Sequence, residues 1–166
     1  LTHDDTPVEI RFDNLNAEVT FASGNLKCRL IEGRYPNYNS VIPTDNPCQM
    51  TIDRRALLGS VKRILPFASE SSQSIRLRLG IGQVEASSED IDFATSAKET
   101  IVCDYNGTPM SIGFKGPSLV EILSSLTSDE VLMELADPSR PCLIFPSEQP
   151  EGQNILMLIM PMLLND

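Results

Sequence analysis

Few residues in this chain have the types and spacing that catalysis or metal binding requires. The single histidine, His3, lies at the amino end, so no central imidazole is available as a general base. The cysteines stand far apart, and no two have the C-x-x-C spacing typical of zinc or redox sites. Each lies in or beside an apolar stretch, which predicts buried free thiols, with a disulfide framework as the alternative. We therefore expect no metal and no cofactor; the cysteines are Cys28, Cys48, Cys103 and Cys142.

One acidic group could in principle do chemistry. Glu89 and Asp90 are adjacent, and Asp92 follows two residues later. Such carboxylates can hold a hard cation or share a proton. They lie in a serine-rich turn, however, where adjacent carboxylates are usually solvated. We therefore expect a protein that is not an enzyme.

The composition is that of a globular protein. The chain has 166 residues, of which 41% are hydrophobic and 22% charged, enough for one ordinary domain plus an additional part. No apolar run approaches the roughly 20 residues of a membrane helix, and the polar, acidic start predicts no cleavable leader. We therefore expect a cytoplasmic protein. Its net charge of −10 argues against a protein that binds nucleic acid through its whole exterior.

The first part of the chain has the pattern of a β-meander. Apolar and polar residues alternate over residues 8–12, 17–21 and 26–30, and Asn, Asp and Gly separate these runs. No helical pattern accompanies them, so we expect exposed strands that could self-associate. Residues 33–48 are rich in proline and asparagine, which predicts an interdomain linker. The expected domains are residues 1–45 and 46–166.

The second part alternates between helical and strand patterns. Asp53 can cap an amphipathic helix that ends near residue 67, and its basic residues gather on a different side from its apolar ones. A second helix is expected over residues 117–126. Together with the strands, this order predicts an α+β domain of two β-α-β-β-β units, with two helices on one side of antiparallel sheets. The expected strands are residues 75–79, 83–87, 100–104, 110–114, 130–136, 142–145 and 154–162.

Two motifs at opposite ends of this pattern suggest a family. The stretch IEGRYPNY at residues 31–38, continued by VIP at 41–43, is followed some 120 residues later by Met160-Pro161-Met162. Together they resemble the bacterial DNA polymerase III beta subunit, the sliding clamp. Residues 53–65 and 110–114 are also similar to that family. The resemblance implies that residues 1–45 are the C-terminal part of the clamp's middle domain plus a linker, and that residues 46–166 are its complete last domain.

The resemblance also implies a function. Clamp protomers form a homodimeric ring that encircles duplex DNA without sequence specificity. The ring is a non-catalytic processivity factor: it tethers the replicative polymerase, and it binds the clamp loader and repair proteins through their short peptide motifs. A generic, non-enzymatic β-rich module that binds peptides at a sheet edge is the alternative.

The family's peptide-binding groove maps onto the linker and the carboxyl end. Methionine side chains adapt to varied apolar anchors, which suits such a groove. For Ile155, Met157 and Ile159 we instead expect packing into the core. Relatives often carry a basic residue at the positions of Ser40 and Leu163, so electrostatic steering of a peptide is not expected here. The matching groove residues are Pro36, Ser40, Val41, Pro141, Leu158, Met160, Pro161, Met162 and Leu163.

Two further surfaces follow from the resemblance. The basic residues of the first helix would face DNA, because an encircling ring needs only a mildly basic lining; an ordinary solvated helix face is the alternative. The end of that helix, Leu65-Pro66-Phe67, would contact the neighbouring protomer, although Phe67 could equally cap the local core. The expected DNA-facing residues are Arg54, Arg55, Lys62 and Arg63.

Overall fold

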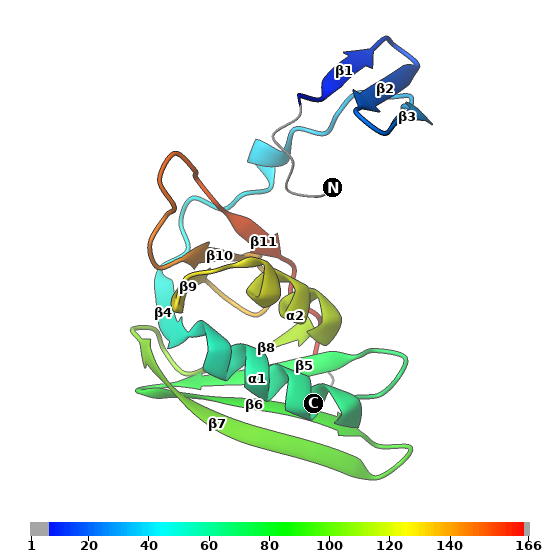
Figure 1. The fold of residues 1–166 in the computed structure, drawn as a ribbon. Helices are drawn as coiled ribbons and strands as arrows, with labels where there is room; N and C mark the ends of the chain where they lie inside the picture. Colours follow the sequence, from blue (N-terminus) through cyan, green and yellow to red (C-terminus); the bar gives the residue numbers. More distant parts are fainter. Residues whose placement is uncertain (1–6, 165–166) are drawn as a thin grey trace. The chain divides into compact units, whose positions relative to one another are not determined.

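The computed structural model describes residues 7–164, so His3 lies outside the described residues. Contacts divide the chain into two compact units, Leu1–Asn37 and Tyr38–Asp166 (Figure 1). No helix within residues 7–164 has the length and apolar character needed to cross a membrane.

The first unit is a three-stranded antiparallel meander. Its strands β1 (Glu9–Phe12), β2 (Asn16–Phe21) and β3 (Gly24–Arg29) follow the three alternating runs of the sequence. Ile10 lies opposite Val19, which lies opposite Leu26, so one face carries an apolar row. Cys28 lies in β3 and is exposed, which contradicts the expectation of a buried thiol. Self-association through this unit stays a prediction.

The second unit begins earlier than the sequence suggested. The short helix η1 (Tyr38–Ser40) and the rest of the proline-rich stretch belong to it, so the boundary lies after residue 37 and not after residue 45. Polar contacts fasten the end of the proline-rich stretch to the rest of the second unit. The side-chain amide of Asn46 donates to the backbone carbonyls of Glu134 (3.0 Å) and Pro141 (3.1 Å), and Asp45 forms an ion pair with Arg140.

The second unit contains two β-α-β-β-β units in sequence, as expected, although its first strand, β4, was not among the expected strands. The first half is β4 (Cys48–Asp53), α1 (Arg54–Ile64), β5 (Ser74–Gly80), β6 (Gln83–Asp90) and β7 (Thr95–Tyr105). A short helix, η2 (Leu65–Phe67), extends α1. The second half is β8 (Met110–Lys115), α2 (Gly116–Ser125), β9 (Glu130–Leu135), β10 (Cys142–Pro146) and β11 (Met157–Ile159).

All eight strands form one antiparallel sheet, in the order β11-β10-β9-β4-β7-β6-β5-β8. The two halves meet at β4 and β7, where Met50 lies opposite Tyr105 and Ile52 opposite Cys103. At the far ends, β8 and the chain after β11 are joined by a single bridge between Gly113 and Met162. We call these two junctions the first seam and the second seam.

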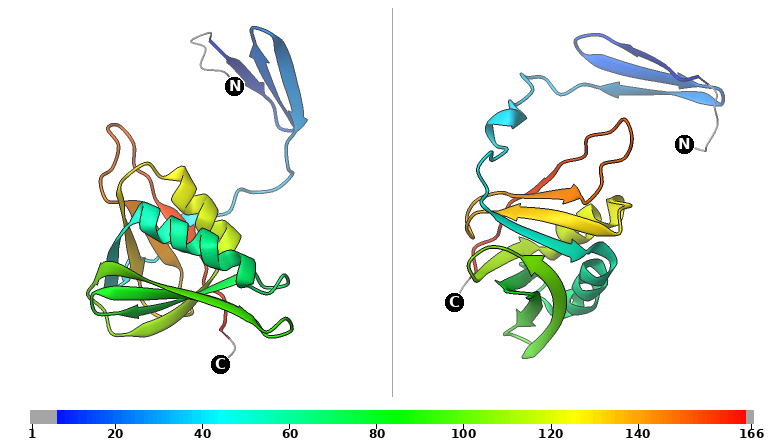
Figure 2. Two further views of the ribbon diagram at one scale, coloured as in Figure 1. Left: turned by 60° about the horizontal axis from the view of Figure 1, so that its bottom comes forward. Right: turned by 90° about the vertical axis from the view of Figure 1, so that its left-hand side faces the viewer.

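The core lies between the sheet and the two helices, which run side by side across one face of the sheet (Figure 2). Leu57 and Val61 of α1 and Leu119 and Leu123 of α2 are fully buried against strand residues such as Leu77. Each such side chain stabilises the fold by about 1.5–3 kcal/mol through burial of apolar surface. The core therefore holds the helices at a fixed place on the sheet.

Two strands differ from the sequence-based expectation. No strand was expected over residues 48–53, where β4 forms, because the preceding prolines indicated a linker. Strand β7 begins at Thr95, five residues before its expected start, and its polar first half is held by pairing with β6.

Candidate functional site

The C-terminal segment, residues 160–164, follows directly from β11. Cys142 pairs with Ile159, and both are buried in the core, so the neighbouring pair Leu143 and Leu158 lies on the opposite face of the sheet. Ile155 and Met157 pack against the core, as the sequence pattern predicts for them and for Ile159.

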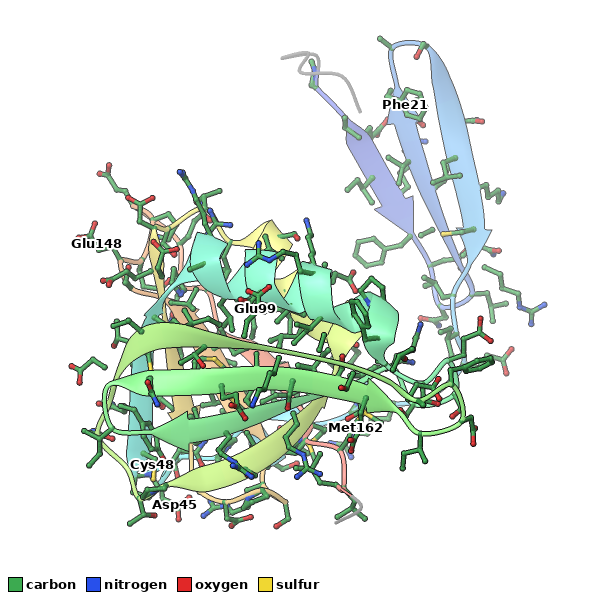
Figure 3. All side chains as sticks on the ribbon, turned by 90° about the horizontal axis from the view of Figure 1, so that it is seen from below. Phe21, Asp45, Cys48, Glu99, Glu148 and Met162 are labelled. Atoms are coloured by element: carbon green, nitrogen blue, oxygen red, sulfur yellow. The ribbon has the colours of Figure 1, made fainter. Side chains whose placement is uncertain are left out.

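Apolar side chains of the C-terminal segment reach solvent. Met160 is 56% exposed and Leu163 is 89% exposed, whereas Pro161 and Met162 are half-buried. Met162 (Figure 3) donates its backbone N–H to the carbonyl of Gly113 at 2.8 Å, which fixes the segment beside β8. Exposed apolar residues on an ordered backbone are what a peptide-binding surface requires.

A cavity of about 740 Å³ adjoins this segment. Met162, Leu163 and Leu164 line it on one side. The rest of its wall comes from the first β-α-β-β-β unit. It includes Ser69, Ser71, Ser72 and Ser74 and residues of β5 and β6 such as Arg76, Arg78 and Glu85. The site therefore combines apolar residues of the carboxyl end with a polar surface of β5 and β6, for which the sequence carries no local signal.

The other expected groove residues lie in different places. Pro141 directly precedes β10, and its carbonyl accepts one of the two hydrogen bonds from Asn46. Ser40 and Val41 follow on the exposed surface of the second unit, whereas Pro36 belongs to the first unit. The linker is thus fastened next to Pro141.

Arg54 differs from the expectation of a DNA-facing residue. Its side chain is only 9% exposed, and it donates hydrogen bonds to the carbonyls of Ser128 (2.6 Å) and Leu123 (3.1 Å). The guanidinium therefore fastens α1 to the end of α2 and is not part of an exposed surface. The sequence contained a signal for this: Arg54 stands three residues before Leu57 and seven before Val61, on the buried stripe of the helix.

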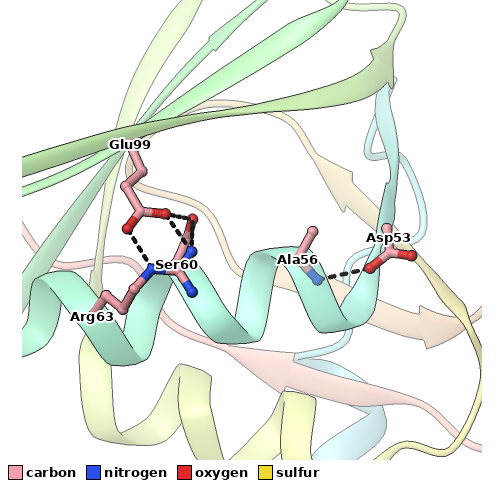
Figure 4. Close-up of polar contacts among 5 residues, drawn as sticks. All are labelled: Asp53, Ala56, Ser60, Arg63 and Glu99. Atoms are coloured by element: carbon pink, nitrogen blue, oxygen red, sulfur yellow. Dashed lines mark hydrogen bonds and ion pairs between the residues drawn. The ribbon is translucent and has the colours of Figure 1, made fainter.

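The remaining basic residues of α1 are exposed. Arg55 forms a long ion pair of 3.6 Å with Asp129, and Lys62 has no ion pair within the described part of the chain. Arg63 makes two hydrogen bonds to the carboxylate of Glu99, of 2.6 and 2.5 Å (Figure 4). The exposed basic surface of α1 is therefore carried chiefly by Arg55 and Lys62.

The pairing of Arg63 with Glu99 ties α1 to β7. The hydrogen bonds from Arg63, together with a further bond from the Ser60 hydroxyl, lower the pKa of Glu99 from 4.5 to about 2. At neutral pH the carboxylate is therefore ionised and neutralises much of the charge of Arg63. The sequence gives no signal for this contact, because Glu99 lies in the polar part of β7, outside the expected strand.

The three residues expected at a ring interface form η2. Phe67 is 40% exposed, and Leu65 and Pro66 line a smaller cavity of about 320 Å³ together with Val120. Close by in the sheet, β7 pairs with β4 only over residues 103–105. Residues 95–102 pair with β6 alone, so within residues 7–164 no strand covers their other edge.

The acidic group and the buried thiols lie in structural surroundings. The carboxylate of Asp90 accepts hydrogen bonds from the backbone N–H groups of Asp92 (3.0 Å) and Phe93 (3.2 Å), so it shapes a turn. Residues 7–164 contain no group of three or more side chains able to hold a metal ion. Burial raises the pKa of the Cys103 and Cys142 thiols, which keeps them protonated.

Comparison with protein families gives a match over most of the second unit. The family model described as DNA polymerase III beta subunit, C-terminal domain, matches residues 39–163. The Beta sliding clamp of Caulobacter vibrioides is 28% identical over 152 residues, which cover 92% of this chain and 39% of that protein. The Beta sliding clamp of Haemophilus influenzae is 27% identical over 164 residues, covering 99% of this chain and 44% of that protein.

A solved structure shows the same fold. The sliding clamp of Bartonella birtlesii, crystallised with griselimycin bound, is 25% identical and superposes with a TM-score of 0.83. The match covers 95% of this chain and 41% of that one. The chain thus spans about two fifths of the length of the clamps that it matches.

Proposed function

This chain belongs to the family of the DNA polymerase III beta subunit, C-terminal domain, and we propose on that basis that it forms part of a ring that encircles duplex DNA. In this proposal the protein is a processivity factor in the cytoplasm and not an enzyme. It tethers the replicative polymerase and other partners, including the clamp loader and repair proteins, through their short peptides. The observation that carries the proposal is the family match over residues 39–163, which includes the exposed C-terminal segment.

The C-terminal segment supports a peptide-binding role. Met160 and Leu163 expose apolar surface, and Met162 is held in place by its bond to Gly113. Thioether side chains repack around different apolar anchors, so one groove can serve several partners. The Bartonella clamp was solved with griselimycin bound, so at least one protein of this fold holds a ligand. The groove proposed here comprises residues of the second unit alone: Pro141, Leu158 and residues 160–163, with Ser40 and Val41 contributed by the linker.

Two positions of the proposed groove, Ser40 and Leu163, are those where the family resemblance implied a basic residue. Ser40 and Leu163 are uncharged, so at these two positions a bound peptide would meet no positive charge. Any dependence of peptide affinity on salt should therefore come from the charged residues of β5 and β6 that line the adjoining cavity, because screening acts on charges and not on buried apolar area.

We propose Arg55 and Lys62 as the principal DNA-facing residues, with Arg63 partly neutralised by Glu99. A ring retains DNA because it surrounds it, so few positive charges are needed on its lining. The net charge of −10 fits this arrangement, because acidic outer surfaces repel DNA that is not encircled.

Ring closure is proposed at η2 and at the uncovered edge of β7. Phe67 and the cavity beside Leu65 offer apolar contact, and residues 95–102 offer backbone groups to a strand of the neighbouring protomer. The same edge supports the second candidate, a module that binds peptides by strand addition.

Titration of a labelled peptide tests the proposal. The probe is a clamp-binding peptide of the glutamine-leucine-x-leucine-phenylalanine type that carries a fluorescent label. The full chain is titrated into it, and the fluorescence anisotropy of the peptide reports binding. Met162→Ala should weaken binding about tenfold, the loss of one important interface side chain. The control Ile81→Ala removes an exposed apolar side chain from the β5–β6 turn and should change nothing. Equal affinities for wild type and Met162→Ala would refute the groove.

A further variant, Ala97→Pro, disrupts the uncovered edge of β7. If peptide binding is lost in this variant and kept in Met162→Ala, the second candidate is favoured.

A further inference from the structure

We propose that Gly113 is a positioning residue for the peptide groove. Its missing side chain leaves a slot on the outer face of β8, and Leu164 fills that slot, which anchors the C-terminal segment and sets the place of Met162. This inference rests on the proposed function, because it concerns the groove assigned above.

The distances at Gly113 show how close the approach is. A Cβ atom at this position would lie 2.6 Å from Leu164 Cδ2 and 2.9 Å from the carbonyl oxygen of Met162. Real Cβ atoms essentially never come within 3.0 Å of another heavy atom. A side chain at residue 113 must therefore displace Leu164 and shift the backbone of Met162.

Gly113 is needed for space and not for backbone conformation. The described glycines with positive φ are Gly33, Gly82 and Gly152, so Gly113 has a conformation that any residue can adopt. Alanine at position 113 would thus fit the strand itself. The obstacle lies in the chain that crosses over it.

The first seam shows why this contact matters. Thr51 lies two residues before the N-cap of α1, as Gly113 lies two residues before the N-cap of α2. Thr51 pairs with Asp104 within a seam of three consecutive register pairs. The second seam has one bridge, so the position of the C-terminal segment depends on the Met162 hydrogen bond and on the packing of Leu164 against Gly113. A single methyl group can therefore release it.

The experiment uses the full chain and the labelled peptide, with amide hydrogen exchange at Met162 as a second readout. Gly113→Ala should weaken peptide binding about tenfold and accelerate exchange at Met162. Gly80→Ala is the matched control, because a Cβ there would meet only the Gln83 carbonyl oxygen at 3.7 Å. The control should leave both readouts unchanged.

Leu164→Ala supplies the decisive comparison. It removes the side chain from the slot, so by itself it should also weaken peptide binding and accelerate amide exchange at Met162. This variant remains informative if Gly113→Ala fails to fold. The double variant should bind no more weakly than Gly113→Ala, because both changes act on one contact. Additive losses, or wild-type binding and exchange in either single variant, would overturn the inference. If the wild-type chain does not bind the peptide, the proposed function fails, whereas exchange at Met162 still tests the anchor.

Discussion

The two halves of the second unit share one topology but differ where their ends meet. In the first seam, β4 and β7 pair over three residues of a continuous strand, and the junction is closed. In the second seam, β8 meets the C-terminal segment through one bridge, and Met160 and Leu163 remain exposed. The closed first seam therefore joins the two halves of the sheet, whereas exposed apolar side chains lie at the second seam, where we propose the peptide groove.

The two helices also differ, both in their first residue and in the charge of their exposed side. At the first helical position α1 has Arg54, whose side chain crosses to α2, whereas α2 has Gly116, which leaves room for Leu65 and Ile75. The exposed side of α1 is basic, whereas α2 carries Glu121 and serines and no basic residue. We infer that DNA-facing charge resides on α1 and that α2 serves mainly to complete the core.

The largest effect is expected from Arg54→Ala. This change leaves the carbonyls of Ser128 and Leu123 without their donor and should lower the free energy of unfolding by about 3 kcal/mol. Chemical denaturation measures the loss. Arg55→Ala is the control, and its effect should stay within about 0.5 kcal/mol because the side chain is exposed. Similar stabilities for the two variants would contradict the assignment of Arg54 to structure and Arg55 to the exposed surface.

The two helices should respond oppositely to glycine replacement. A Cβ at Gly116 would lie 2.5 Å from Leu65 Cδ1 and 2.9 Å from Ile75 Cγ1, so Gly116→Ala should cost about 2 kcal/mol through overpacking. In the middle of α1, a Cβ at Gly59 meets only the flexible end of Arg63, at 3.1 Å. Gly59→Ala should therefore stabilise the protein by about 0.5–1 kcal/mol, because alanine favours the helix. Thermal unfolding of both variants distinguishes the signs, and a gain at both sites would refute the tight packing at Gly116.

A smaller effect concerns pH. The pKa of Glu99 lies at about 2 in the folded chain, against 4.5 for an ordinary glutamate. Its contribution to stability is therefore complete above pH 4.5 and is lost as the pH falls towards 2. NMR titration of the Glu99 carboxyl carbon should give the low value, and Arg63→Ala should raise it towards 4.5. An ordinary pKa in the wild-type chain would mean that Arg63 is free to extend the basic surface of α1.

The smallest perturbation is thiol labelling under native conditions. Only Cys28 of the four cysteines is exposed, and burial raises the pKa of Cys103 and Cys142, so one thiol per chain should react rapidly with an aromatic disulfide reagent. Cys28→Ser should abolish the rapid phase. Rapid reaction of Cys142 would indicate that β10, which supports the second seam, opens readily.

Much of this architecture could be predicted from the sequence because apolar periodicity marks buried faces. Both helices and most strands follow that pattern. Strand β4 also alternates, with Cys48, Met50 and Ile52 buried, but its signal was masked by the neighbouring prolines and by the cap at Asp53. The polar start of β7 carries no apolar signal at all, since its partner strand determines it.

The site was less predictable, because its residues are defined by distant contacts. The motif Met160-Pro161-Met162 suggested a groove at the carboxyl end, which stays a proposal. However, nothing in the local sequence indicates that Gly113 receives Leu164 or that Glu99 pairs with Arg63. Arg54 shows the opposite situation: helical spacing placed it on the buried stripe, but its charge suggested an exposed role.

NMR of methyl-labelled methionine tests the central claim most directly, because the six methionines sample both the core and the proposed groove. On titration with the clamp-binding peptide, the methyl signals of Met160 and Met162 should shift in a saturable way. Those of Met50 and Met133, which are fully buried, should stay in place. Saturable binding that leaves the Met160 and Met162 signals unchanged would contradict a groove at the carboxyl end.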